Sequence, residues 1–245
     1  MKCVVLAAGY ATRLYPLTKN FPKPLLQVNG KPVLDWLLDD LTDNCGIDEV
    51  FVVSNHKFAS IFQSWADEKK YKVSVIDDNT TSNENRLGAV NDLNLVIKTR
   101  NLNEDLLVVA GDNLLNFSLK SFIDFAKTKK TSCILSYYEG DKNKLSKSGV
   151  VKFDQTGRVI SMEEKPKNPS SNWVVPPFYY LFKEDLKLID KAINDGCGVD
   201  APGSFIGWLA TNSTLFAKKM TGKRFDIGDI HSYNKVKEEF EGFEK

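Results

Sequence analysis

The chain has 245 residues, of which 42% are hydrophobic and 27% are charged, a composition typical of an ordinary globular protein. Its 33 basic and 32 acidic residues leave a formal net charge of +1, so bulk charge favours neither nucleic acid nor an anionic membrane. No apolar run approaches the roughly 18 residues of a membrane helix. The four cysteines contain no C-x-x-C pair, so we expect a reduced, cytoplasmic protein without a zinc site or a disulfide framework.

Residues 1–130 alternate between short apolar runs and helical patterns. Ser118 is placed to cap the last helix of this series. The alternation predicts a mostly parallel sheet with helices on both faces, in which ligands bind beyond the carboxyl ends of the strands. The expected strands are 2–9, 48–55, 71–78 and 104–113, and the expected helices are 31–46, 58–70, 87–100 and 118–130.

From about residue 130 the pattern changes to strands joined by turns. The sequence FDQTGRVI, residues 153–160, predicts a hairpin within this part. We expect one compact domain over 1–245, whose second half, 131–245, adds strands to the sheet. The expected elements are strands within 132–140, 148–166 and 172–182, a helix over 183–195, a short mixed segment over 205–212, a strand over 213–220 and a closing helix over 229–243.

The loop after the first strand combines a glycine with cations on a stiff backbone. Gly9 ends the strand and allows backbone N–H groups to approach an anion, and Arg13 follows with a planar fork suited to phosphate oxygens. Lys23 lies between Pro22 and Pro24, and the second proline biases its backbone toward an extended conformation. The segment matches neither the P-loop nor the dinucleotide fingerprint. It predicts an anion site of another kind.

The pattern G-x-x-T-R-L-x-P-L-T-x-x-x-P-K-P-L-L-x-V, residues 9–28, resembles the signature loop of the sugar-1-phosphate nucleotidyltransferases, and most of all that of glucose-1-phosphate thymidylyl- and uridylyltransferases. The resemblance implies a Rossmann-like α/β/α sandwich with a mixed, mostly parallel central sheet, the nucleotide-diphospho-sugar transferase type. It implies Mg²⁺-dependent condensation of a nucleoside triphosphate, dTTP or UTP, with a sugar 1-phosphate. Residues 1–130 would bind the nucleotide and 131–245 the sugar phosphate.

Three further motifs strengthen the resemblance. Asp112 follows a buried strand, where a carboxylate can hold a hard divalent cation against a triphosphate, and the family has a magnesium ligand there. Asp226, in KRFDIGD, matches the second magnesium ligand, whereas its neighbour Asp229 is the expected N-cap of the closing helix. Glu164 and Lys165 match the family's Glu-Lys-Pro, in which the carboxylate binds sugar hydroxyls and the ammonium binds the sugar phosphate.

The resemblance assigns roles residue by residue. Asn83 stands where the family has the glutamine that reads a pyrimidine, and Gly149 where a backbone group contacts the sugar. The implied nucleotide contacts are Leu6, Ala8, Gly9, Thr12, Arg13, Lys23, Asn83 and Gly88; the catalytic residues are Arg13, Lys23 and Asp112; the sugar-phosphate contacts are Gly149, Glu164 and Lys165; the metal ligands are Asp112 and Asp226. Lys19 has no counterpart and is predicted to be a surface charge.

Departures from the family pattern leave alternatives open. Ser148 replaces a common tyrosine, and 172–180 lacks the Thr-Gly of the thymidylyltransferase sugar pocket, so the sugar stays undecided. A cytidylyltransferase for a non-sugar phosphate or phosphonate is one alternative, and a non-catalytic nucleotide-sugar-binding regulatory protein is another. The expected partners are a nucleoside triphosphate and a sugar 1-phosphate, without nucleic acid or membrane, for a monomer or a homodimer.

Overall fold

The computed structural model describes residues 1–243, which form two compact units that interleave along the sequence. Unit 1 comprises Met1–Arg86, Ala110–Ser121 and the chain from Thr221. Unit 2 comprises Leu87–Val109 and Phe122–Met220. Residues 221–243 therefore belong with the N-terminus, whereas we expected them to group with the second half of the chain. Among residues 1–243, no helix is both long and apolar enough to cross a bilayer.

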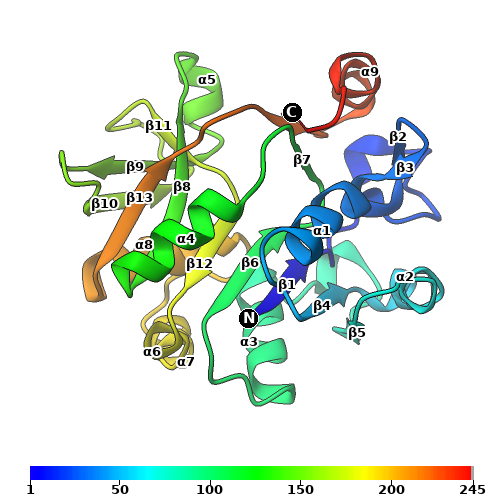
Figure 1. Ribbon diagram of the computed structural model, residues 1–245, viewed down its shortest axis with the longest axis horizontal. Helices are drawn as coiled ribbons and strands as arrows, with labels where there is room; N and C mark the ends of the chain where they lie inside the picture. The colour runs from blue at the N-terminus through cyan, green and yellow to red at the C-terminus, as the bar shows by residue number, and fades with distance from the viewer. Residues whose placement is uncertain (244–245) are drawn as a thin grey trace. The chain divides into compact units, whose positions relative to one another are not determined.

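Three parallel strands form the centre of unit 1, with β4 (Glu49–Ser54) between β1 (Lys2–Leu6) and β5 (Val73–Asp77) (Figure 1). The central residues of β1 and β4 are apolar and buried, as expected for parallel strands that are covered on both faces, whereas β5 at the end of the three is mostly half-buried. Helices α1 (Val33–Asp43) and α2 (His56–Asp67) confirm two of the predicted helices.

Unit 1 also contains short strands that the sequence did not predict. A hairpin joins β2 (Gln27–Val28) to β3 (Lys31–Pro32), and β7 (Asn113–Leu115) pairs antiparallel with β14 (Arg224–Asp226). The last helix of the unit is α9 (Ile230–Glu239). A buried cluster packs these parts together, and it contains Leu14, Leu26, Val28, Val33, Leu114, Ile227, Tyr233, Val236 and Phe240.

Unit 2 contains a sheet in the order β10, β9, β11, β8, β12, β6, with β13 added beside β8. Neighbours in this order are antiparallel, and only β13 runs parallel to β8, an arrangement visible in Figure 1. The hairpin predicted around FDQTGRVI is confirmed as β9 and β10. The strands are β6 (Leu106–Ala110), β8 (Ser132–Tyr138), β9 (Gly149–Phe153), β10 (Val159–Glu164), β11 (Trp173–Val175), β12 (Phe178–Leu181) and β13 (Leu215–Lys219).

The helices of unit 2 include two corrections. The single helix predicted over 183–195 is two short helices, α6 (Lys183–Leu186) and α7 (Ile189–Asn194). The segment predicted as mixed is a full helix, α8 (Pro202–Asn212), which starts with a proline at a position where no N–H donor is needed. The other helices are α3 (Ala89–Thr99), α4 (Lys120–Lys129) and α5 (Lys142–Leu145). Ser118 accepts a hydrogen bond from the Lys120 N–H at 3.1 Å, as predicted for a cap of α4.

Candidate functional site

The loop that follows β1 is anchored to the end of β4. The Ala7 N–H donates to the carbonyl of Val53 at 2.9 Å, and the Asn55 side chain donates to the carbonyl of Ala8 at the same distance. Gly9 comes next, and no atom lies within 4 Å of the place where its β-carbon would stand. Gly9 thus opens space at the strand end, beside the candidate contacts Leu6 and Ala8.

Arg13 lies on a short 3-10 turn, η1 (Thr12–Leu14), whose ends are fixed. Ala11 precedes it with a φ of 48°, so the left-handed residue of this loop is Ala11 rather than Gly9. Leu14 is buried in the core of unit 1, while Thr12 and Arg13 are exposed. The guanidinium is therefore presented to solvent from an anchored turn, where it can meet an anion.

Lys23 opens a second 3-10 turn, η2 (Lys23–Leu25), which corrects the extended backbone that we expected there. Pro22, just before the turn, is the extended residue, with φ −73° and ψ 136°. Lys23 is only 9% exposed, and its ammonium donates to Oδ2 of Asp112 at 2.5 Å. Pro24 packs against Gly111, where an added β-carbon would lie 3.3 Å from its Cγ. The proline and the glycine together seat Lys23 beside Asp112.

Asp112 is held in its ionised form by its neighbours. Its side chain is 33% exposed, and its Oδ1 accepts from the Asn113 amide at 2.7 Å. Burial of the Asp112 carboxyl raises its pKa, but the Lys23 ammonium and its hydrogen bond, helped by the charge of Arg224, outweigh burial and bring the pKa below its ordinary 3.8. Arg224 in turn donates to Oδ1 of Asn113.

Asp226 reaches the same place through strand pairing. In the β14–β7 ladder Asp226 is opposite Asn113, the residue after Asp112, although 112 and 226 are distant in the sequence. The Asp226 side chain is 53% exposed, and its Oδ1 lies 3.7 Å from the Arg224 guanidinium. Asp229 caps α9 instead, as predicted, by accepting from the Ser232 N–H at 2.8 Å. Of the two carboxylates predicted to hold metal, Asp112 therefore directly precedes β7, and Asp226 ends the strand that pairs with β7.

These two carboxylates fit a metal that also takes ligands from its substrate. Among residues 1–243 no group of three or more His, Cys, Asp and Glu side chains could enclose an ion by itself. Magnesium is usually held by one or two carboxylates together with substrate phosphates and water, and it prefers oxygen ligands. Asp112 and Asp226 supply that number and kind of ligand.

The candidate base contacts fall in separate units. Asn83 is exposed in unit 1, on the 3-10 turn η3 (Asn83–Asn85), and its carbonyl accepts from the Arg86 guanidinium at 2.8 Å. Gly88 is in unit 2, where it precedes α3 with a φ of 89°. A β-carbon at Gly88 would overlap the carbonyl oxygen of Val199 and lie 2.8 Å from its carbonyl carbon. Gly88 is thus required by its backbone and by its packing.

We expect Gly88→Ala to lower the free energy of unfolding by about 2–6 kcal/mol, since a strained backbone and an overpacked contact each cost about 1–3 kcal/mol. Gly46→Ala is the control, because Gly46 has a φ of 67° but nothing within 4 Å of its β-carbon position. Urea denaturation of both variants gives the comparison. Equal losses of unfolding free energy in the two variants would show that the contact with Val199 contributes nothing to the cost of Gly88→Ala.

The candidate sugar contacts lie together in unit 2. Gly149 on β9 is the cross-strand partner of Glu164, the last residue of β10. Lys165 follows with a φ of 48°, an uncommon conformation for a residue other than glycine, and its N–H donates to the carbonyl of Ser148 at 3.0 Å. Such backbone strain occurs preferentially at binding sites. The strand end therefore turns Lys165 outward while Glu164 points into a pocket.

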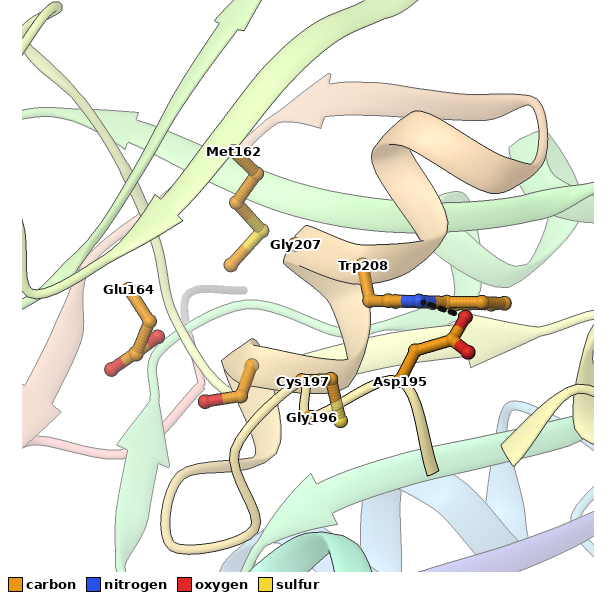
Figure 2. A pocket seen from close by; sticks show the side chains of 8 residues that line it. Met162, Glu164, Asp195, Gly196, Cys197, Gly207 and Trp208 are labelled. Carbon is orange, nitrogen blue, oxygen red and sulfur yellow. Dashed lines mark hydrogen bonds between the residues drawn. The ribbon is translucent and has the colours of Figure 1, made fainter. Parts of the chain in front are cut away.

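Glu164 lines a pocket of about 440 Å³. Figure 2 shows Met162 and Glu164 on one side of it and Trp208 with Asp195 on the other. The Trp208 indole is fixed by its hydrogen bond to Oδ2 of Asp195 at 3.2 Å. Burial raises the pKa of the Glu164 carboxyl above its ordinary 4.5, and the charge of Lys165 opposes this in part. The lining side chains are Met162, Glu164, Asp195, Cys197, Ser204 and Trp208.

Four of these lining residues escaped sequence reasoning, namely Asp195, Cys197, Ser204 and Trp208. They lie on α8 and the loop before it. Of these four, Asp195 ended the helix predicted over 183–195, Trp208 fell in the segment predicted as mixed, and no element was predicted for the other two. The proline at the start of α8 could have indicated Ser204 and Trp208, because a helix beginning at Pro202 points residues 204 and 208 to one side.

A protein-family model described as nucleotidyl transferase matches residues 2–241. The UTP–glucose-1-phosphate uridylyltransferase AglF of Haloferax volcanii is 32% identical over 237 residues, which cover 93% of this chain and 91% of that protein. A glucose-1-phosphate adenylyltransferase of Thermosipho africanus is 26% identical over 94% of this chain, which spans 59% of its length. Other curated relatives are also longer, and the chain spans between 51% and 62% of them.

Among solved structures, a UDP-glucose pyrophosphorylase complexed with UDP-glucose superposes with a TM-score of 0.81 over 97% of both chains, at 20% sequence identity. At that level of identity the likeness concerns the fold, and it confirms the nucleotidyltransferase type of α/β architecture predicted for this chain.

Proposed function

Because the chain belongs to the nucleotidyl transferase family, we propose that it joins a nucleoside triphosphate to a sugar 1-phosphate, releasing pyrophosphate and forming a nucleotide-sugar. The observation that carries this proposal is the Lys23–Asp112 ion pair, with Asp226 on the adjacent strand. A nearly buried ammonium paired with one carboxylate, with a second carboxylate on the strand that pairs with β7, suits a metal-bound polyphosphate better than it suits a merely structural role.

The reaction needs positioning and charge neutralisation, and no protein nucleophile. An oxygen of the sugar phosphate attacks the α-phosphorus, the bond from that phosphorus to the bridging oxygen of the β-phosphate breaks, and pyrophosphate leaves with the bond electrons. Arg13 and Lys23 neutralise charge on the α-phosphate and on the leaving group. Glu164 accepts hydrogen bonds from sugar hydroxyls, and Lys165 holds the attacking phosphate. Gly9, Thr12, Asn83, Gly88 and Gly149 complete the contacts that we propose.

Nucleotidyltransferases of this family generally use a divalent metal ion. We assign Mg²⁺ to this chain, with Asp112 and Asp226 as its protein ligands. When bound, the ion offsets negative charge on the phosphates of the nucleotide. Asp112 is suited to the role because its lowered pKa keeps it ionised at neutral pH. Lys23, its present partner, is then available to the phosphates.

The first substrates to test follow from the relatives. One relative, about a third identical to this chain, is named as a UTP–glucose-1-phosphate uridylyltransferase. This supports UTP and glucose 1-phosphate as the first substrates, with dTTP as a close analogue of UTP. All four cysteines are free and three are buried, which supports a reducing, cytoplasmic location. The near-zero net charge supports small-molecule partners over nucleic acid.

We expect pyrophosphate release that requires a nucleoside triphosphate, a sugar 1-phosphate and a divalent cation together, and that stops when EDTA is added. The assay covers dTTP, UTP, CTP, ATP and GTP against a panel of sugar 1-phosphates and phosphocholine. Release with phosphocholine and CTP alone would instead indicate a cytidylyltransferase for a non-sugar phosphate. Nucleotide-sugar binding without any release would indicate a regulatory protein.

A further inference from the structure

The Glu164 carboxylate lies in a slot between two glycines from different elements, Gly149 on β9 and Gly203 on α8. A β-carbon at Gly149 would lie 3.0 Å from Oε2 of Glu164 and 3.0 Å from Cε of Met162. A β-carbon at Gly203 would overlap Oε2, and it would lie 3.1 Å from Cδ of Glu164. The carboxylate thus occupies the place that a side chain on α8 would take.

Helix α8 comes this close because of its glycines. Gly203 and Gly207 are four residues apart and so share one face of the helix. Gly207 faces the backbone of β10, since its β-carbon would stand 3.1 Å from the carbonyl oxygen of Met162. The close approach of α8 to β10 places the Gly203 backbone directly against Glu164.

No hydrogen bond within residues 1–243 fixes the Glu164 carboxylate, although its neighbours largely enclose it. Ion pairs and hydrogen bonds position the other carboxylates of the candidate site, such as Asp112. For Glu164 the walls of the slot take this role, with the charge of Lys165 nearby. A carboxylate that accepts no hydrogen bond keeps its acceptor oxygens available for a ligand.

We propose that Gly203 is a positioning residue for sugar recognition, because the absence of a side chain there leaves the Glu164 carboxylate in the pocket, where a hydroxyl of the substrate sugar donates to it. This inference rests on the proposed function, since it takes the sugar 1-phosphate as the ligand. It assigns part of the sugar selectivity to α8, an element outside the motifs that indicated the family.

The cost of a side chain at Gly203 falls on binding rather than on folding. The atoms that it would overlap are the free end of a flexible side chain, which can rotate away, and alanine is a better helix former than glycine. Gly203→Ala should therefore fold, with the Glu164 carboxylate displaced from its place in the pocket. We expect the KM for glucose 1-phosphate to rise about tenfold, as when a hydrogen bond to a charged group is lost. The KM for UTP should stay within about twofold.

Gly157→Ala is the matched control in the same unit. Gly157 lies in the turn between β9 and β10 with a φ of 84°, and its β-carbon would stand 2.9 Å from the carbonyl oxygen of Ala217. This clash is with backbone, so Gly157→Ala should lower the Tm while leaving the KM for glucose 1-phosphate unchanged. Gly203→Ala should instead keep the Tm and raise the KM for glucose 1-phosphate. Calorimetric titration with glucose 1-phosphate gives the same comparison without turnover.

A double-mutant cycle with Glu164→Asp tests the contact itself. Aspartate withdraws the carboxylate by one methylene, which makes room for a methyl group at residue 203. We expect the Gly203→Ala/Glu164→Asp variant to bind glucose 1-phosphate no more weakly than Glu164→Asp alone. Additive losses, or an unchanged KM in Gly203→Ala, would overturn the inference while the wild type remains active. A wild type that neither binds glucose 1-phosphate nor turns over would overturn the proposed function, and the inference with it.

Discussion

Asp112→Asn should lower the turnover number about a hundredfold or more, the loss expected when a preorganised charge contact is removed from a transition state. Asparagine keeps the shape of the side chain, and its one amide oxygen can still accept from Lys23 or from Asn113, which bond different oxygens of Asp112. Because the side chain is partly exposed, the fold should survive the loss of the other bond. What it lacks is the negative charge that holds a divalent cation. Initial rates of pyrophosphate release with UTP and glucose 1-phosphate measure the effect, and a magnesium titration should show a higher half-saturating concentration.

Asp43→Asn is the matched control for this prediction. Asp43 is exposed at the end of α1 in the same unit, so its variant should keep normal turnover and normal magnesium dependence. Circular dichroism of both variants checks that the fold is retained. If Asp112→Asn turns over within tenfold of the wild type, Asp112 is not the metal ligand that we propose.

Lys23→Ala should likewise lower turnover about a hundredfold or more, because it removes a nearly buried cation from the phosphates. It also removes the charge that contributes most to lowering the pKa of Asp112. The stability that a lowered carboxyl pKa provides is present above the unfolded-state pKa and is lost as pH falls through the folded-state pKa. In Lys23→Ala the folded-state pKa rises, so this contribution shrinks and the acid limb of the rate profile moves to higher pH.

Lys19→Ala separates a specific role from a general loss of positive charge. Lys19 lies on the same loop but is exposed, so its removal should leave turnover within about twofold of the wild type. Rates and pH profiles of the two lysine variants are measured side by side. Near-normal turnover in Lys23→Ala, or equal losses in both variants, would contradict the role proposed for Lys23.

Local patterns in the sequence were enough for much of the fold and for the reaction class. Apolar periodicity predicted α1 and β4, the FDQTGRVI turn predicted the β9–β10 hairpin, and Asp229 was recognisable as a cap from the helix that follows it. Each of these depends on residues within a few positions of one another. The signature loop is also contiguous, and for that reason it pointed to the family directly.

Tertiary structure alone decided how the pieces of the site meet. Lys23 lies 89 residues from Asp112, and Asp226 reaches Asn113 only because a three-residue strand too short to show periodicity pairs with β7. Helix α8 was missed because packing against β10, rather than an alternation of polar and apolar residues, makes it stable. The slot between Gly203 and Glu164 follows from that packing. Contacts between distant segments depend on which surfaces bury one another, and local sequence does not encode that choice.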